Sequence, residues 1–272
     1  MSHYLKLVHL EISRFRLVLL SLMVLTFGFQ TVGIIVTVNR ELSMRAENPL
    51  YNGVDGSFVP EGTLSFAWAV YTSNFWYYIP IMISLVVLLA YMPAIWYREW
   101  FGRNTVIYRL LMLPGARFRV YTSKLTAVLL FVFAMIGFQM LVLPVQESIF
   151  NLMVPSAERV DTYLEDAIAA NQLLSLFLPR SLEQFVYSYG LGMIGVTAVF
   201  AVILLERSFR WLGLLAGLVY LAVCWFVLLL PLLDTGYFYP IEYYFFELAA
   251  CALVLCASVG LGGWLLARKI SV

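Results

Sequence analysis

Apolar residues in this 272-residue chain are gathered into six long runs separated by more polar stretches. A helix needs about 20 consecutive, mostly apolar residues to cross the hydrocarbon core of a bilayer, and each run is of that order. The runs cover residues 17–38, 75–97, 125–145, 185–205, 211–233 and 243–267. A spanning backbone must satisfy its own hydrogen bonds, so runs of this length predict helices. The pattern therefore predicts an all-α integral membrane protein with six transmembrane helices.

Residues 1–16, which precede the first run, show a helical periodicity. Apolar side chains fall on one face of this helix and polar ones on the other: Tyr4, Leu5, Val8, Ile12 and Phe15 against Lys6, His9, Ser13 and Arg14. This pattern predicts an amphipathic helix that lies in the membrane interface. The alternative is a plain cytoplasmic extension of the first span.

Two long stretches, 39–74 and 146–184, are expected to be external loops. The first contains several turn-forming pairs and then a series of aromatic residues, which is typical of a loop that returns to the bilayer interface. In the second, Ser156 can cap a helix, and acidic residues follow it. Apolar residues recur there at helical spacing, at Val160, Leu164 and Ile168. A short, acidic surface helix is therefore expected in the second loop.

Composition and charge agree with this picture and orient it. The chain is 62% hydrophobic and 12% charged, whereas soluble domains are about 45 to 50% apolar. Most of its 17 Lys and Arg residues lie before the first run, after the second, after the fourth and after the sixth. The positive-inside rule makes these segments cytoplasmic, so both termini are expected inside the cell. We expect residues 1–272 to form one multi-pass transmembrane domain in the plasma membrane of a bacterial cell.

Three polar residues inside the runs are candidate functional groups, because polar side chains at membrane depth are costly. Gln30 and Gln139 are amides deep in the first and third runs. Each can hydrogen-bond a neighbouring helix or line a substrate path. Glu247 lies about one turn inside the sixth run, where its carboxylate either has a function or reaches back to the interface.

The stretch 98–124, between the second and third runs, is the most basic part of the chain. Its charges are Arg98, Arg103, Arg109, Arg117, Arg119 and Lys124, against one acid, Glu99. Binding of these cations to anionic lipid would by itself account for the charge.

A short amphipathic helix is predicted within this stretch. Asn104 can cap its start, and Pro114 and Gly115 end it after about three turns. Its apolar stripe consists of Val106, Ile107, Leu110 and Leu113. A helix this short is marginal in water, so it either lies on the membrane surface or packs into a partner.

The order of residues in this segment resembles the cytoplasmic coupling segment of type 2 ABC exporter permeases. The resemblance is carried by Glu99, Thr105, the Leu-Leu-Met-Leu-Pro sequence at 110–114, Arg117 and Lys124, together with the six-span architecture. It implies a short coupling helix that contacts a separate ATP-hydrolysing subunit and transmits the closure of that subunit to the spans. The contact residues that it implies are Glu99, Arg103, Thr105, Val106, Ile107, Arg109, Leu110, Leu111, Leu113 and Arg117.

The chain itself contains no phosphate-binding loop of the form Gly-x-x-x-x-Gly-Lys-Ser/Thr. ATP and Mg²⁺ are therefore expected on the partner, and no cofactor, metal or catalytic residue is expected in this chain. The resemblance implies two ATPase subunits and a second permease, identical or homologous; no nucleic acid is expected. Because the deep spans lack fixed charge, an apolar or amphipathic cargo such as a drug, peptide or lipid is expected.

Other functional classes remain as alternatives. An ATP-independent carrier, or a membrane protein for peptide immunity or sensing, would have a similar span pattern. An intramembrane enzyme is disfavoured, because the only histidines, His3 and His9, precede the first run and no Gly-x-Ser-x-Gly elbow is present.

Overall fold

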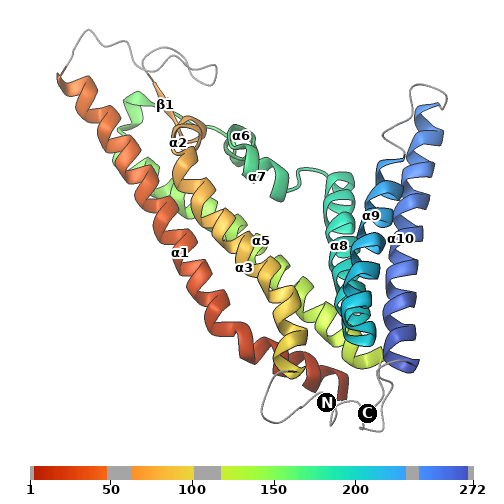
Figure 1. The fold of residues 1–272 in the computed structure, drawn as a ribbon. Coiled ribbons are helices and arrows are strands. Elements are labelled where there is room, and N and C mark those ends of the chain that lie inside the picture. Colours follow the sequence, from red (N-terminus) through yellow and green to blue (C-terminus); the bar gives the residue numbers. More distant parts are fainter. Residues whose placement is uncertain (1–2, 48–62, 101–117, 231–238, 269–272) are drawn as a thin grey trace. The chain divides into compact units, whose positions relative to one another are not determined.

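The computed structural model describes residues 3–47, 63–100, 118–230 and 239–268 (Figure 1). Within these residues, six helices are long and apolar enough to cross a membrane, in agreement with the predicted number of spans. They are α1 (His3–Glu47), α3 (Asn74–Trp100), α5 (Phe118–Met153), α8 (Leu182–Phe209), α9 (Trp211–Leu229) and α10 (Pro240–Arg268). The fold is that of a multi-span, helical membrane protein.

The first helix, α1, joins two elements that the sequence pattern separates. The expected interfacial helix, 1–16, and the expected first span, 17–38, belong to one helix that runs without a break from His3 to Glu47. This part of the chain contains no proline, and its first glycine is Gly28, so no residue near position 16 ends the helix. Its backbone matches the alternative of a continuous extension, whereas its placement in the interface stays a prediction.

The two predicted external loops contain more regular structure than expected. The helices α1 and α5 continue into these stretches. The stretches also contain β1 (Leu64–Ser65), α2 (Phe66–Thr72), a 3-10 turn (Ser156–Glu158), β2 (Arg159–Val160), α6 (Leu164–Ala170) and α7 (Gln172–Phe177). The helix expected after Ser156 begins only at Leu164. Arg159 and Val160, which were expected to be helical, are extended instead, because they pair in parallel with Leu64 and Ser65. A partner so distant in sequence overrides the local helical pattern.

Contacts divide the chain into two compact units. The first unit comprises Met1–Arg14, Leu88–Leu130 and Tyr189–Val272, and the second comprises Phe15–Val87 and Phe131–Ser188. Four of the long helices, α1, α3, α5 and α8, contribute residues to both units.

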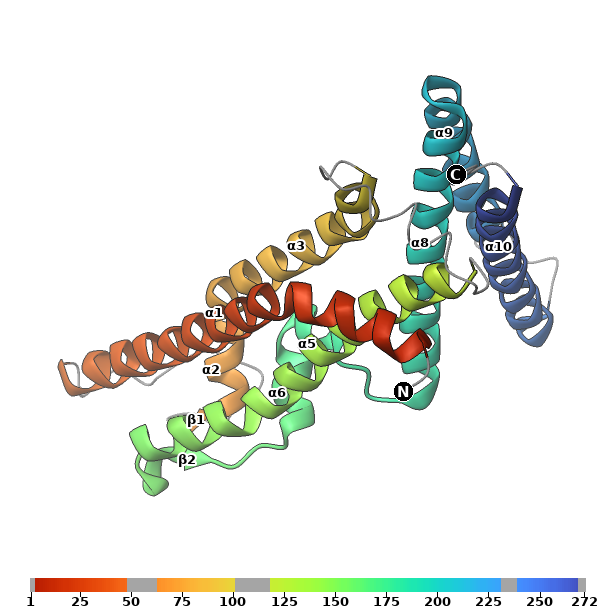
Figure 2. The same ribbon diagram turned by 90° about the horizontal axis from the view of Figure 1, so that it is seen from below.

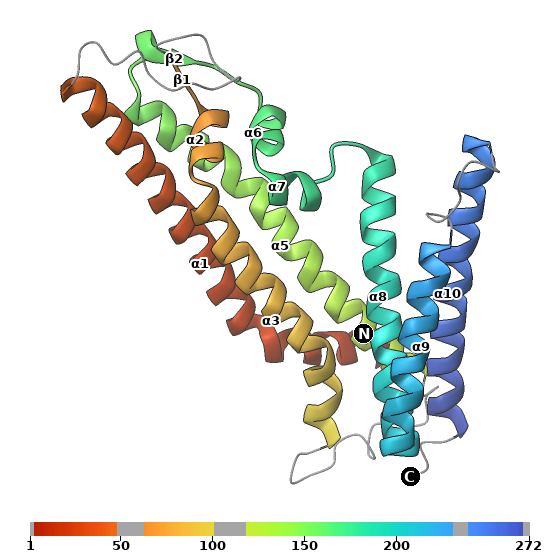
Figure 3. The ribbon, with the colours of Figure 1, turned by 45° about the horizontal axis from the view of Figure 1, so that its top comes forward.

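In the second unit, the short elements form a cap over the ends of three long helices. We define the cap as β1, β2, α2, α6 and α7; Figures 2 and 3 show α2 beside α6, with β1 and β2 at the same end. Its buried core joins Leu64, Phe66 and Leu174 to Phe150 of α5 and to Val154, which follows α5. Burial of this apolar surface gives the predicted loops a fixed structure.

In the first unit, the last three long helices, α8, α9 and α10, pack closely on one another. A Cβ added to Gly213 of α9 would lie 2.0 Å from the backbone oxygen of Leu205 in α8, and one added to Gly217 would lie 2.7 Å from Val202. Small residues permit such close approach between membrane helices. The hydroxyls of Tyr220 and Ser258, 2.7 Å apart, join α9 to α10.

One glycine in the second unit is required by the contact between α1 and α3. A Cβ added to Gly33 would lie only 2.3 Å from the Cβ of Trp76, a separation that real side chains do not tolerate. Gly28, about one and a half turns earlier in the same helix, has no such neighbour within 4 Å of its added Cβ. The two glycines therefore form a matched pair for testing the packing.

We expect Gly33→Ala to lower the free energy of unfolding by about 1–3 kcal/mol, because the added methyl group forces α1 and α3 apart. Gly28→Ala should cause no loss of stability, since its methyl group meets open space. Denaturation of the purified protein in detergent micelles measures both effects. Equal stability of the two variants would contradict the packing of α1 on α3.

Candidate functional site

The N-terminal part of α1 places an acid among buried apolar side chains. Val8 and Glu11 lie on one face of the helix, with only 6% and 3% of their surface exposed. Leu5, Lys6, His9 and Leu10 lie on the exposed face. The same buried face begins at Tyr4, whose hydroxyl lies 2.6 Å from the hydroxyl of Thr126 in α5. The amphipathic pattern of this segment therefore also serves helix packing within the protein.

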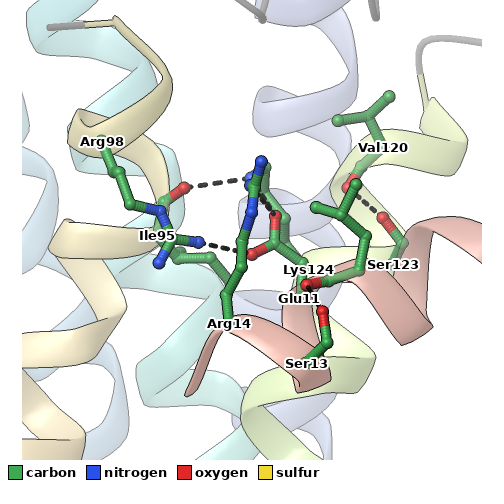
Figure 4. A network of polar contacts seen from close by, with 9 residues as sticks. Glu11, Ser13, Arg14, Ile95, Arg98, Val120, Ser123 and Lys124 are labelled. Carbon is green, nitrogen blue, oxygen red and sulfur yellow. Dashed lines mark hydrogen bonds and ion pairs between the residues drawn. The ribbon is translucent and has the colours of Figure 1, made fainter. Parts of the chain in front are cut away.

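Glu11 accepts hydrogen bonds from cations on two other helices (Figure 4). Lys124 Nζ in α5 donates to Glu11 Oε1 at 2.9 Å, and Arg98 Nη2 in α3 donates to Glu11 Oε2 at 2.9 Å. Arg14, one turn along α1, has its Nη1 3.9 Å from Oε1. We call Glu11, Arg98 and Lys124 the Glu11 cluster. Its carboxylate joins three helices by charge-assisted hydrogen bonds.

Lys124 is the most deeply buried cation of this cluster. Its side chain is 1% exposed, whereas that of Arg98 is 41% exposed. Nζ also donates to the backbone oxygen of Ile95 at 3.0 Å and lies 5.2 Å from the centre of the Trp96 ring. A buried ammonium needs such partners, because taking a charge out of water costs several kcal/mol.

Aromatic side chains pack beside the cluster and extend it to α8 and α10. The rings of Trp96, Tyr121 and Phe200 are all fully buried, and Phe200 meets the other two edge to face, with centroids 5.6 and 5.8 Å apart. A Cβ added to Gly262 of α10 would lie 3.0 Å from the Tyr121 ring. These aromatic rings are therefore tightly packed beside Lys124.

A second polar contact ties the end of α3 to α8. The Tyr97 hydroxyl donates a hydrogen bond to the Glu206 carboxylate, and the guanidinium of Arg207 lies 4.8 Å from the centre of the Tyr97 ring. Adjacent residues of α3, Tyr97 and Arg98, thus hold α8 and α1 respectively. The last turns of α3 form a junction for helices of the first unit.

The two cations of the Glu11 cluster lie on either side of segment 101–117 in the sequence. Arg98 lies at the end of α3 and Lys124 in the second turn of α5, so the two cations flank segment 101–117. Both donate to one carboxylate on α1. The two residues that flank the segment are therefore bonded to the same side chain. Within the described ranges, no group of three His, Cys, Asp or Glu residues is arranged to hold a metal ion.

Most of the predicted partner-contact residues lie outside the described residues. These are Arg103, Thr105, Val106, Ile107, Arg109, Leu110, Leu111, Leu113 and Arg117. Glu99 belongs to the last turn of α3, but its side chain is also outside the described part of the structure. The expected coupling helix thus stays a prediction.

The three polar candidates within the spans are all among the described residues. Gln30 and Gln139 are hydrogen-bonded to each other in the second unit, with Nε2 of Gln139 3.0 Å from Oε1 of Gln30. Glu247 is a half-buried residue of α10 in the first unit. The structure brings the two amides together within the second unit.

Glu11 was not among the residues selected from the sequence. The sequence indicates the burial of Glu11 through its spacing. Tyr4, Val8, Glu11 and Phe15 are three or four residues apart, so Glu11 lies on the same helix face as apolar residues. An acid on such a face requires a buried cation. Lys124 belongs to the motif that resembles a coupling segment. Its partner, Glu11, could not be inferred from the local sequence, because the two residues are 113 positions apart.

No family model, curated protein or solved structure matches this chain. The class of protein is therefore defined by its helices: a multi-span membrane protein with a buried charge cluster.

We expect Glu11→Met and Lys124→Met each to lower the free energy of unfolding by about 3–5 kcal/mol, because each leaves a buried group without its main partner. The double variant should lose much less than the sum of the two, since the charges are removed together. Asp161→Asn, which removes the negative charge from the exposed contact with Arg159, should have little effect. Denaturation of the purified variants in micelles measures these differences, and strict additivity would contradict a direct Glu11–Lys124 interaction.

Proposed function

We propose that this chain is the membrane-spanning permease subunit of an ATP-driven ABC exporter. The observation that carries the proposal is the shared carboxylate of Glu11, which holds the cations on both sides of segment 101–117. A segment that receives force from a partner needs firm attachment at both ends. The Glu11 cluster supplies such an attachment and connects it to a third helix.

In this proposal, segment 101–117 binds a groove of a separate ATPase subunit through its apolar stripe, Val106 to Leu113. Closure of the ATPase on ATP moves the segment, and Arg98 and Lys124 transmit the movement to α1 through Glu11. Glu11 is thus a positioning residue rather than a catalytic one. Transport requires that the ATPase bind two states of the permease with different free energies, and a firmly attached segment makes such a difference possible.

The charge distribution supports a cytoplasmic position for this segment and for both termini. Lys6, Arg14 and Arg16 precede the first apolar run, and six basic residues follow the second. By the positive-inside rule these parts face the cytoplasm, where an ATPase and its nucleotide are available. A plasma membrane, bacterial in origin, is the proposed location.

The proposed cargo is apolar or amphipathic. Among the described residues, the apolar runs 17–38, 75–97, 125–145, 185–205 and 211–230 contain no Asp, Glu, Lys or Arg. A small ion would need fixed polar ligands at such depth. A drug, peptide or lipid needs fewer of them. ATP and Mg²⁺ would be held by two ATPase subunits, and a second permease, identical or homologous, would complete the pathway.

The test uses the full chain co-expressed with the ABC ATPase encoded nearest to its gene. We expect Leu110→Asp with Leu113→Asp to abolish co-purification of the ATPase and permease-dependent ATP hydrolysis in nanodiscs, because two carboxylates cannot be buried in an apolar groove. The permease itself should keep its thermal stability.

The matched control introduces the same two charges elsewhere, at exposed small residues of the predicted external side. Ala157→Asp with Ala169→Asp should leave ATPase binding and hydrolysis unchanged. Unaltered coupling in the Leu110 and Leu113 variant, or failure of any ATPase to bind the wild-type chain, would refute the proposed function.

A further inference from the structure

A closed set of polar side chains joins three helices in the second unit. Gln30 of α1 and Gln139 of α5 exchange two hydrogen bonds, at 3.2 and 3.0 Å. Gln146 of α5 donates to Gln30 Oε1 at 3.2 Å, and the Tyr77 hydroxyl of α3 donates to Gln146 Oε1 at 2.7 Å. We call Gln30, Tyr77, Gln139 and Gln146 the amide seam.

The seam is buried and uses its own hydrogen-bonding groups. Gln30, Tyr77 and Gln146 have no exposed surface, and Gln139 is 8% exposed. Each of the three amide oxygens accepts at least one hydrogen bond from another seam residue. A side chain that binds cargo must offer groups that are accessible, whereas these groups are already paired with one another.

Two further contacts fix α1 against α3 next to the seam. Gly33 of α1 lies against Trp76 of α3, where even a methyl group does not fit. Ser73, which precedes α3, donates to the hydroxyl of Thr37 in α1 at 3.0 Å.

A buried amide, in addition to the apolar core, attaches the cap to α3. Asn171 donates from its Nδ2 to Asn74 Oδ1 at 2.7 Å, and its own Oδ1 accepts the backbone N–H groups of Leu173 and Leu174. The residue is fully buried. One side chain thus caps α7 and fixes it to the start of α3.

Separating these helices in a membrane would be costly. Lipid offers no replacement hydrogen bonds, so each amide freed from the seam would remain unsatisfied. Movement past one another would also drive Gly33 against a large aromatic side chain. Both the polar and the steric contacts therefore oppose relative motion of α1, α3 and α5 in this unit.

We infer that the second-unit parts of α1, α3 and α5 move with the cap as one rigid body. Gln30 and Gln139 are helix-fixing residues, and a cargo path does not pass between these three helices. The rigid-body statement is independent of the proposed function; only the statement about the cargo path rests on it. Conformational change must then occur at other helix contacts.

Spin-label distances in the isolated full chain test the inference. Cysteines at Val36, Ile83 and Leu141 would carry the labels, in pairs, because these residues of α1, α3 and α5 are exposed. Cys224, Cys251 and Cys256 lie in the first unit and would be replaced by alanine. In lipid nanodiscs we expect one narrow distance distribution for each pair. A broad or two-peaked distribution in the otherwise unaltered chain would overturn the rigid body.

Substitutions within the seam should change these distances in a fixed order. Gln30 takes part in three of the four hydrogen bonds, Gln139 in two and Tyr77 in one. Broadening should therefore decrease from Gln30→Leu to Gln139→Leu to Tyr77→Phe. The matched control is Thr26→Val, which removes a buried hydroxyl whose 2.7 Å hydrogen bond stays within α1.

The control should retain the distribution of the unaltered chain. If Gln30→Leu left every distribution unchanged, or if Thr26→Val broadened them equally, the seam would not be what holds the body together. Since no ATPase is present, these outcomes are separate from failure of the proposed function, which appears only in the co-purification experiment.

Discussion

The ammonium of Lys124 is a positive charge almost completely enclosed by protein, and the arrangement of the first unit follows from its need for partners. Glu11 supplies the opposite charge, Ile95 supplies a backbone oxygen, and Trp96 supplies an aromatic face. These three groups come from α1 and α3, while the lysine comes from α5. Satisfying one charge therefore fixes α1 to the last turn of α3 and to the second turn of α5.

The buried polar networks singled out in the two units differ in kind. In the first, ionised groups meet at a cluster that reaches the surface through the half-exposed Arg98, so its interactions respond to charges and forces from outside. In the second, neutral amides and a tyrosine form a closed set that offers nothing to a partner. In the proposed function, the charged cluster is the contact that transmits motion, and the amide seam is the contact that resists it.

The spans were predictable because about 20 apolar residues in sequence are sufficient to define a membrane helix. The cap was not, because β1 and β2 pair residues 64–65 with 159–160, and no local pattern specifies a partner so far away. Gln30 and Gln139 could be selected as unusual residues, but only the fold shows that they bond to each other. Glu11 was overlooked, since its role depends on Arg98 and Lys124 from other helices.

The most direct test of force transmission through Glu11 is a distance between spin labels in the first unit, measured with and without trapped nucleotide on the bound ATPase. Leu5 of α1 and Leu218 of α9 are exposed positions of the first unit for the labels, and the distance between them reports movement of α1. The account predicts a nucleotide-dependent shift in the unaltered cluster and loss of that shift in Glu11→Gln, with the ATPase still bound. An identical shift in both proteins would contradict it.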